Sequence, residues 1–312
     1  MSWALNNVIL SPDEAEVFRR KVLPACDDVI VEIGFGNGEF LLDMASRDKR
    51  GFYFGIEVSM TSMLKAARKC LALYLSNVRL LFGDGSFLLR EFFLPESVDK
   101  VYVNFPCPWP KKRHAKRRLV TPDFACNLAH ALKVGGFFEL ASDELWYVED
   151  ARRCLLENPA FAVDEVAVGK DSSFRTKYEE KWISMGKSIY RLKAAKGMPF
   201  RAEPVADWEA VALNVKAKKT GEWNASRLNC LFGLTGGDER FRWTFKDLFF
   251  GSEGVCLLQA ITVDDGFEQK FYIRIVPVED EVLIKLDDAS SVYRTPAVKK
   301  SFAALAEEIE RL

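Results

Sequence analysis

The sequence predicts an α/β protein in which a doubly wound, mostly parallel sheet is followed by a smaller α+β domain. Two observations support this prediction. Short apolar runs alternate with segments of helical period up to about residue 193, and beyond residue 204 strand-like runs follow one another directly. The 312 residues, 49% hydrophobic and 29% charged, suffice for two globular domains. We place these domains at residues 1–197 and 198–312.

The first domain begins with a helix and continues as alternating strands and helices. Ser11-Pro12-Asp13-Glu14 combines a capping box with proline at the first helical position, and Pro24 ends that segment. Five apolar runs are predicted strands: 28–34, 51–58, 78–82, 100–105 and 136–141. Helical periodicity covers segments such as 38–47, 62–75 and 122–132. Because the runs are apolar at consecutive positions and helix-length connections join them, they are typical of parallel strands covered on both faces.

The second domain has a different pattern. Strand-like runs at 241–250, 254–263, 267–277 and 281–286 are joined by turns at Asp264-Asp265-Gly266 and Glu279-Asp280. Pro296 begins a last helix that reaches Leu312. The sequence therefore predicts a β-meander with one terminal helix.

Composition excludes several classes of protein. Seven scattered cysteines without a Cys-x-x-Cys pair, and only two histidines, argue against a disulfide framework and against a metal site. No apolar run approaches the ~18 residues of a membrane span, and the first ten residues contain no Lys or Arg. We expect a cytoplasmic protein with no metal and no membrane or protein partner.

A glycine loop follows the first predicted strand. Its sequence, Glu32-Ile33-Gly34-Phe35-Gly36-Asn37-Gly38, leads directly into a helix. A dinucleotide fingerprint requires its third glycine one residue later, and the Glu32 carboxylate would repel a pyrophosphate. That carboxylate suits a ligand with a cationic amino acid end, such as S-adenosylmethionine. The other interpretation of Gly34, Gly36 and Gly38 is an ordinary tight turn.

Two further acids end the second and third predicted strands. Glu57 lies nineteen residues after Gly38, where a carboxylate can accept hydrogen bonds from both ribose hydroxyls. Asp84 follows the third strand, where its side chain could contact the adenine amino group. Since the carboxyl ends of parallel strands meet at one edge, these acids favour a Rossmann-like S-adenosylmethionine-dependent methyltransferase over solvated strand ends.

A proline-rich loop and a basic run follow the fourth strand. Pro106-Cys107-Pro108-Trp109-Pro110 is rigid, and residues 111–118 carry six formal positive charges in eight positions. A charge run is usually a solvated helix face. Because this run is joined directly to the predicted transfer site, we expect it to bind phosphates of a nucleic acid instead.

These motifs resemble the bacterial tRNA (guanine-N7)-methyltransferase family, in its long form with an extra C-terminal domain. The family pattern Pro-Asp-Pro-Trp-Pro-Lys with following basic residues matches 106–118, and its cofactor loop matches 32–38. Its Thr-Asp and Thr-Lys-Phe-Glu elements match Ser142-Asp143 and Thr176-Lys177-Tyr178-Glu179, over a similarity of about residues 5–193. The resemblance implies methylation of N7 of a guanosine in the tRNA variable loop. It assigns the cofactor to Glu32, Gly34, Gly36, Gly38, Glu57 and Asp84, and the tRNA guanosine to Lys111, Asp143, Thr176, Lys177, Tyr178 and Glu179.

One position departs from the family pattern. Cys107 stands where the family has an aspartate between the two prolines, so we place it with the cofactor-binding residues and assign no catalytic residue. Guanine N7 carries a lone pair and no proton, so its methylation requires alignment and no general base. Two alternatives stay open: a tRNA-binding protein that has lost turnover through Cys107, and an amino-group methyltransferase, suggested by Asn104-Phe105-Pro106.

Aromatic residues outside these motifs allow two interpretations. Trp146 and Tyr147 could stack on a flipped base or pack on the sheet, and His130 is predicted to be structural. In the second domain, Trp223 and Trp243 with neighbouring arginines could form an RNA platform. The charge balance argues against that domain as the main RNA contact, because residues 198–312 sum to -4 and residues 1–197 to +3.

Overall fold

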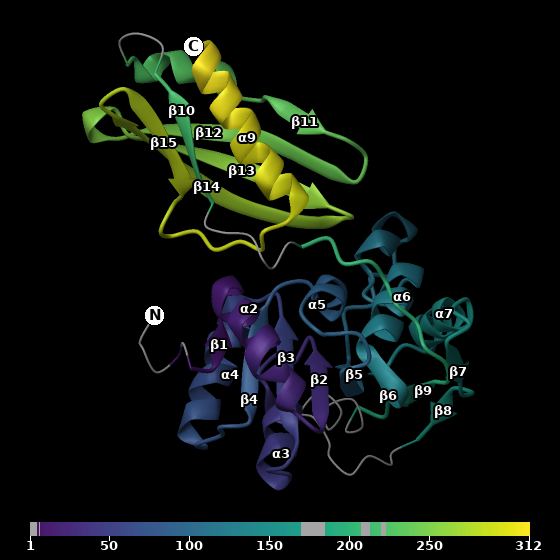
Figure 1. The fold of residues 1–312 in the computed structure, drawn as a ribbon. Coiled ribbons are helices and arrows are strands. Elements are labelled where there is room, and N and C mark those ends of the chain that lie inside the picture. Colours follow the sequence, from purple (N-terminus) through teal and green to yellow (C-terminus); the bar gives the residue numbers. More distant parts are fainter. Residues whose placement is uncertain (1–4, 6, 170–184, 207–212, 220–222) are drawn as a thin grey trace. The chain divides into compact units, whose positions relative to one another are not determined.

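The computed structural model describes residues 5, 7–169, 185–206, 213–219 and 223–312. The chain divides into two compact units, Met1–Pro204 and Val205–Leu312, coloured purple to teal and green to yellow in Figure 1. Each unit has its own sheet and its own hydrophobic core.

A nine-stranded sheet forms the centre of the first unit, in the order β1-β4-β3-β2-β5-β6-β9-β7, with β8 paired to β9. All pairs from β1 to β6 are parallel. The strands are β1 (Ile9–Leu10), β2 (Val29–Ile33), β3 (Phe52–Glu57), β4 (Val78–Phe82), β5 (Val98–Asn104), β6 (Leu132–Ser142), β7 (Phe161–Val163), β8 (Ala167–Val168) and β9 (Tyr190–Lys196). This arrangement confirms the doubly wound, mostly parallel sheet.

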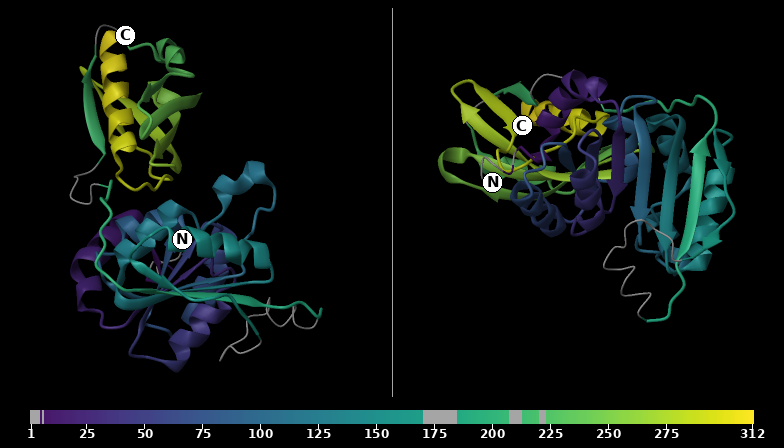
Figure 2. Two further views of the ribbon diagram at one scale, coloured as in Figure 1. Left: turned by 90° about the vertical axis from the view of Figure 1, so that its right-hand side faces the viewer. Right: turned by 90° about the horizontal axis from the view of Figure 1, so that it is seen from below.

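Helices connect the parallel strands and cover both faces of this sheet (Figure 2). They are α2 (Pro12–Lys21), α3 (Glu39–Arg47), α4 (Met60–Ala72), α5 (Gly85–Glu91), α6 (Pro122–Ala131) and α7 (Leu145–Leu156), with short 3-10 helices η1 (Leu23–Ala25) and η2 (Lys112–Arg117). The predicted capping box of α2 is present, since Ser11 Oγ accepts from the Glu14 N–H and Glu14 accepts from the Ser11 N–H.

The far edge of the sheet was not predicted. Strand β9 runs antiparallel to β6 and β7, and its last residue, Lys196, is buried. Lys196 Nζ donates to the Leu132 carbonyl at 2.8 Å and to Glu96 Oε1 at 3.2 Å. Beside it, buried His130 accepts the Ala202 N–H at Nδ1, 3.1 Å away, which supports its structural role.

The second unit is a six-stranded antiparallel sheet in the order β10-β15-β14-β13-β12-β11, with a helix lying against one face (Figure 1). Its strands are β10 (Asn214–Lys218), β11 (Thr235–Gly237), β12 (Phe241–Phe250), β13 (Cys256–Asp264), β14 (Phe267–Val278) and β15 (Glu281–Leu286). The helices are η3 (Ala225–Leu231), η4 (Ser252–Gly254) and α9 (Pro296–Arg311). The meander and the terminal helix are as predicted.

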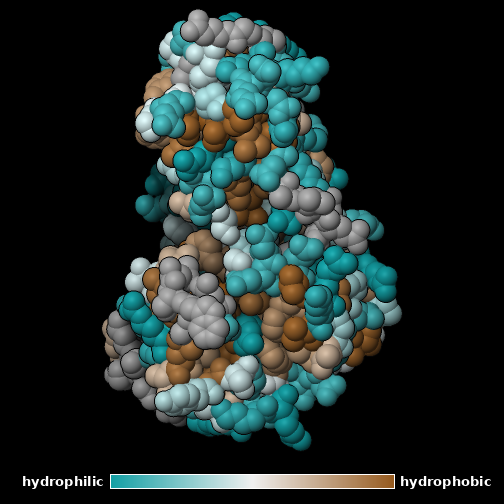
Figure 3. Space-filling view, turned by 60° about the vertical axis from the view of Figure 1, so that its left-hand side comes forward, coloured by the Kyte–Doolittle hydropathy of each residue, from teal (hydrophilic) through white to brown (hydrophobic). Residues whose placement is uncertain are grey.

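Polar and charged side chains cover most of the surface seen in Figure 3, with apolar patches between them. Within the described ranges, none of the helices has both the length and the hydrophobicity needed to cross a bilayer. All seven cysteines are free thiols.

Candidate active site

The glycine loop lies where the strand order reverses. β2 has β3 on one side and β5 on the other, so the loop after β2 opens at the switch point of the sheet, where doubly wound folds bind ligands. Gly34, Gly36 and Gly38 all have positive φ, at 72°, 54° and 74°. A Cβ on Gly38 would lie 2.9 Å from the Ala66 Cβ, whereas a Cβ on Gly34 or Gly36 would meet nothing within 4 Å. The loop therefore packs tightly on α4 at one end and leaves open space above its first two glycines.

Glu32 is buried at the end of β2 beneath this loop. Its side chain accepts a hydrogen bond at Oε1 from Asn104 Nδ2, 3.1 Å away on β5, and only 2% of the residue is exposed. Oε2 is buried and accepts no well-formed hydrogen bond from any described residue. Burial raises the pKa of Glu32 to about 7, in spite of the hydrogen bond from Asn104. A buried carboxylate oxygen without a donor, such as Glu32 Oε2, fits a cationic group of a ligand, which would supply the hydrogen bond.

Glu57 connects β3 to the glycine loop. Oε2 accepts the Gly36 N–H at 3.0 Å, and Oε1 accepts the N–H groups of Val58 and Ser59, each at 2.9 Å. A carboxylate has about four lone-pair positions, so these three bonds leave capacity for a hydroxyl donor. Glu57 thus holds the loop in shape as well as presenting a carboxylate beside it, and the first of these roles was not expected from the sequence.

Asp84 begins α5 as its N-cap. Oδ1 accepts the Phe87 N–H at 2.8 Å, which leaves Oδ2 for another donor. Two apolar side chains lie at neighbouring strand ends: Phe82 is 40% exposed, and Val58 is 67% exposed. Sequence reasoning missed both, although Val58 directly follows Glu57 and Phe82 lies two residues before Asp84, and this closeness to the acids was a usable signal. Phe82 pairs with Glu57 across β3 and β4, so apolar and acidic groups occupy the same edge.

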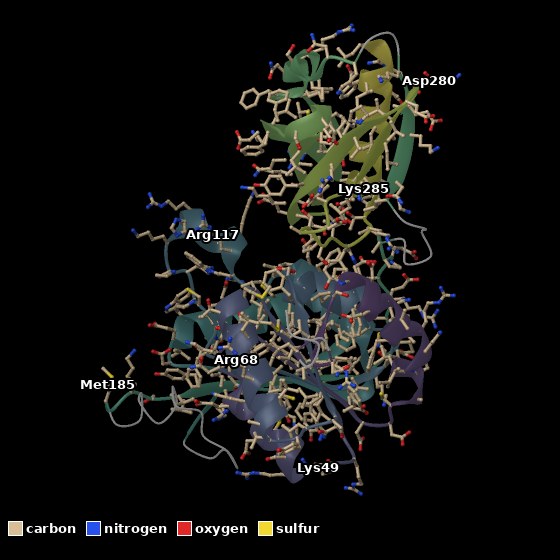
Figure 4. The ribbon with its side chains drawn as sticks, turned by 90° about the vertical axis from the view of Figure 1, so that its left-hand side faces the viewer. Lys49, Arg68, Arg117, Met185, Asp280 and Lys285 are labelled. Carbon is tan, nitrogen blue, oxygen red and sulfur yellow. The ribbon has the colours of Figure 1, made fainter. Side chains whose placement is uncertain are left out.

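The loop after β5 is irregular and carries the basic run outward. Phe105 and Trp109 have positive φ, at 50° and 46°, which non-glycine residues rarely adopt. The run then forms η2, which stands out from the rest of the unit with Arg117 on it (Figure 4). Lys111, Lys112, Arg113, Lys116 and Arg117 are exposed.

Arg118, the last cation of the run, lies inward and differs from the other five. Its side chain is 15% exposed, and NH1 donates to Asp150 Oδ2 at 2.9 Å. Its guanidinium also lies 3.4 Å from the Trp109 carbonyl oxygen and 5.0 Å from the Trp146 ring centroid. The expectation that all six cations face a polyanion is therefore wrong for Arg118, because this residue fastens the end of the loop to its start and to α7.

The other predicted substrate residues are placed as follows. Asp143 Oδ2 accepts from Lys187 Nζ at 2.6 Å, so its charge is already paired. The Cys107 thiol is exposed in the loop after β5. Thr176, Lys177, Tyr178 and Glu179 lie outside the described residues.

The structure separates the aromatic residues that could stack on a base from those that pack in a core. Tyr147 is 1% exposed and packs in the core, so it cannot stack on a base, whereas Trp146 is 38% exposed and its indole N–H donates to Glu144 at 3.0 Å. The proposed aromatic platform of the second unit is wrong. Trp243 belongs to the hydrophobic core there, and Trp223 is partly buried against that core, with its indole N–H donating to the Gly254 carbonyl.

Comparison with known proteins supports a methyltransferase site at the carboxyl ends of the parallel strands. A family model described as "Putative methyltransferase" matches residues 27–192. A tRNA (guanine-N(7)-)-methyltransferase of Thermotoga maritima is 37% identical over 300 residues, which cover 95% of this chain and 92% of that protein. Proteins of the same name from Coprothermobacter proteolyticus and Aquifex aeolicus are 32% and 30% identical, over 92% and 89% of this chain and 88% and 92% of their own lengths. The similarity thus extends through both units.

Proposed function

The chain belongs to the family of tRNA (guanine-N(7)-)-methyltransferases, and we propose that it transfers a methyl group from S-adenosylmethionine to N7 of a guanosine in tRNA. The observation that carries this proposal is the group formed by buried Glu32, the glycine loop and Glu57 at the switch point of the sheet. This group fits a ligand that has both an ammonium and a ribose. We also propose that the protein acts in the cytoplasm, because its proposed substrate is tRNA.

The cofactor supplies a methyl group bound to a positively charged sulfur. The Glu32 carboxylate receives the ammonium of its amino acid end, and Glu57 uses its remaining lone-pair capacity for a ribose hydroxyl. Val58 and Phe82 provide apolar contact for the adenine, and Asp84 Oδ2 accepts from its amino group. Gly34 and Gly36 allow the backbone to approach the ligand closely.

The reaction requires no general base in the protein. N7 of guanine has a lone pair in the plane of the ring and carries no proton, so the protein has to hold that lone pair in line with the methyl group. Asp143, once released from Lys187, and Glu179 are the acceptors that we assign to the N1–H and N2–H groups of the guanine. We assign no proton transfer to Cys107.

The exposed cations of η2 hold the tRNA backbone. Lys111 lies at the start of η2, and the cations that follow, up to Arg117, are exposed, so they can contact phosphates without reading bases. Arg118 keeps this segment in place through Asp150 and the Trp109 carbonyl. We assign Thr176, Lys177 and Tyr178 to the same substrate.

An assay of the modified nucleoside tests the proposal. Purified protein is incubated with S-adenosylmethionine and an unmodified tRNA transcript, which is then digested to nucleosides and analysed by mass spectrometry. We expect 7-methylguanosine, and its loss when one guanosine of the variable loop is replaced by adenosine. Methylation of another nucleoside, or of a protein amino group in place of tRNA, would refute the assignment.

A further inference from the structure

The sheet of the second unit has two faces of different character. One face packs against α9 and η3 and contributes Phe245, Leu258, Phe271 and Ile273 to the core. Residues of the opposite parity point to the other face. No described element of this unit packs over that face, which we call the open face.

The open face carries positive charge in a unit that is acidic overall. Residues 205–312 contain 14 basic and 18 acidic residues, a net charge of -4. Strand register places six cations on the open face: Lys216, Lys218, Arg242, Lys270, Arg274 and Lys285. Among the described strand residues in regular register, the acids on this face are Glu268 and Glu281, while Lys246 and Asp247 lie together at a β-bulge in β12. A sheet face that only contacts water has no need to gather cations in this way. The cations gather here although the unit as a whole is negatively charged.

Some of these cations are paired at the rim and others are not. Lys216 contacts Glu281 at 2.7 Å, Arg274 contacts Asp287 at 3.6 Å, and Lys285, labelled in Figure 4, contacts Asp288 at 3.9 Å. Arg242 and Lys270 are exposed and form no ion pair with any described residue. Exposed ion pairs contribute little to stability, so phosphates can replace the carboxylates of these pairs.

Aromatic and apolar side chains lie between the cations. Tyr272 and Phe249 meet with ring centroids 6.1 Å apart, and Gln259 Nε2 donates to the Tyr272 hydroxyl at 2.9 Å. Phe249 is 49% exposed and Tyr272 is partly exposed. Open antiparallel sheets that present aromatic rings among Lys and Arg are suited to RNA, since the rings stack on bases and the cations bind phosphates.

We propose that the open face is a second tRNA-binding surface, which holds a part of the tRNA other than the methylated guanosine. This inference rests on the proposed function for the identity of the RNA. Charge complementarity selects RNA over a second protein chain, because a protein partner of similar size would need a more apolar and less uniformly charged centre. The two surfaces, η2 and the open face, would then share the tRNA backbone.

Binding of bulk bacterial tRNA to the full-length protein tests this proposal. The variant Arg242→Ala/Lys270→Ala removes two of the open-face cations that form no ion pair with any described residue. The control variant Arg227→Ala/Arg311→Ala removes the same charge from η3 and from the end of α9, which lie on the covered side. Affinity is measured by filter binding over a range of salt concentrations without cofactor, and methylation is measured separately at saturating tRNA.

We expect the open-face variant to bind tRNA at least about tenfold more weakly near 0.1 M salt, with a log-log salt slope lower by about 1.4–1.8. Its melting temperature and its rate at saturating tRNA should equal those of the wild type, and the control should bind normally. Equal binding by the open-face variant and the wild type, or equal losses in both variants, would overturn the proposal. So would wild-type self-association that the variant abolishes without a change in tRNA binding. Because binding is measured without cofactor, the two proposals can fail separately. If the protein binds tRNA through the open face but methylates nothing, only the proposed function is refuted.

Discussion

Glu32 is the residue on which the cofactor assignment depends most. It is buried, one oxygen is held by Asn104, and the other is left for a ligand, so its ionised form is costly until a cation arrives. Burial raises the pKa of this carboxyl to about 7. Near neutral pH the carboxyl is therefore partly protonated in the protein without ligand, and an ammonium selects the ionised form.

This state predicts a pH-dependent affinity. A protonated Glu32 has to lose its proton before it can pair with an ammonium, so the affinity for S-adenosylhomocysteine should fall as pH drops below 7 and level off above it. Calorimetry between pH 6 and 8 should also detect proton release on binding. The matched variant Glu32→Gln should bind weakly at every pH and release no proton. Affinity of the wild type that stays constant across this range would contradict the assignment.

Glu57 predicts a different outcome, because it serves the loop and the ligand together. Glu57→Ala removes the acceptor of three backbone N–H groups and of the ribose, and charged hydrogen bonds contribute about 1.5–3 kcal/mol each. We expect affinity for S-adenosylmethionine to fall at least about tenfold. Glu57→Gln should lose less, since its amide oxygen still accepts. Calorimetry measures these affinities, with the exposed Glu157→Ala as the control. If Glu57→Ala binds S-adenosylmethionine as tightly as the wild type, Glu57 does not bind the cofactor.

Single residues also mark the limit of what the sequence predicts. The acids Glu32, Glu57 and Asp84 lie at one sheet edge as expected, because the carboxyl ends of parallel strands must meet there. Arg118 could not be separated from its neighbours, since its inward orientation depends on Asp150, which is 32 positions away in the chain. The pairing of Asp143 with Lys187, over 44 positions, is equally invisible in a local pattern.

Among the elements, η2 is the segment whose predicted contact with tRNA phosphates can be tested through the salt dependence of tRNA affinity. Lys112→Ala/Lys116→Ala removes two exposed cations, so the slope of log affinity for tRNA against log salt should fall by about 0.7–0.9 per lost phosphate contact. Arg118→Ala should leave the slope unchanged, because this side chain is held by the protein, but should destabilise the unit by roughly 1–3 kcal/mol. Filter binding and thermal melting measure the two effects. Equal slope changes in both variants would mean that Arg118 is also a phosphate contact.

Elements with a strong local pattern were predicted to the residue. β4, β12 and β15 begin and end where the apolar runs begin and end. β6 starts four residues earlier than expected, at Leu132, because the β5–β6 pairing has an irregularity with extra residues in β6, which lets Leu132 pair with Val98. The antiparallel β9 was missed, since the sequence YRLKAAK carries three cations and its stability comes from β6 and the buried ion pair of Lys196.

At the scale of the whole molecule, a net charge of -1 conceals how charge is distributed. η2 carries a run of exposed basic side chains in one unit, and six of the 14 basic residues of the second unit lie on the open face, although that unit is acidic overall. A protein of this kind binds a polyanion at defined surfaces and not as a generally basic particle. We therefore expect tRNA affinity to depend on these surfaces and catalysis to depend on the carboxyl ends of the parallel strands.

The central claim is that this chain, with Cys107 in place of an aspartate, turns over as a methyltransferase. The most direct measurement incubates the wild type and Cys107→Ala with S-adenosylmethionine and excess tRNA, then cleaves the RNA with borohydride and aniline at 7-methylguanosine. We expect strand scission at one position in many tRNA molecules per protein molecule. Cys107→Ala should stay within about tenfold of the wild type, because at most one weak hydrogen bond of ~1 kcal/mol is lost. Tight tRNA binding without scission by the wild type would contradict the claim and leave a tRNA-binding protein that has lost its activity.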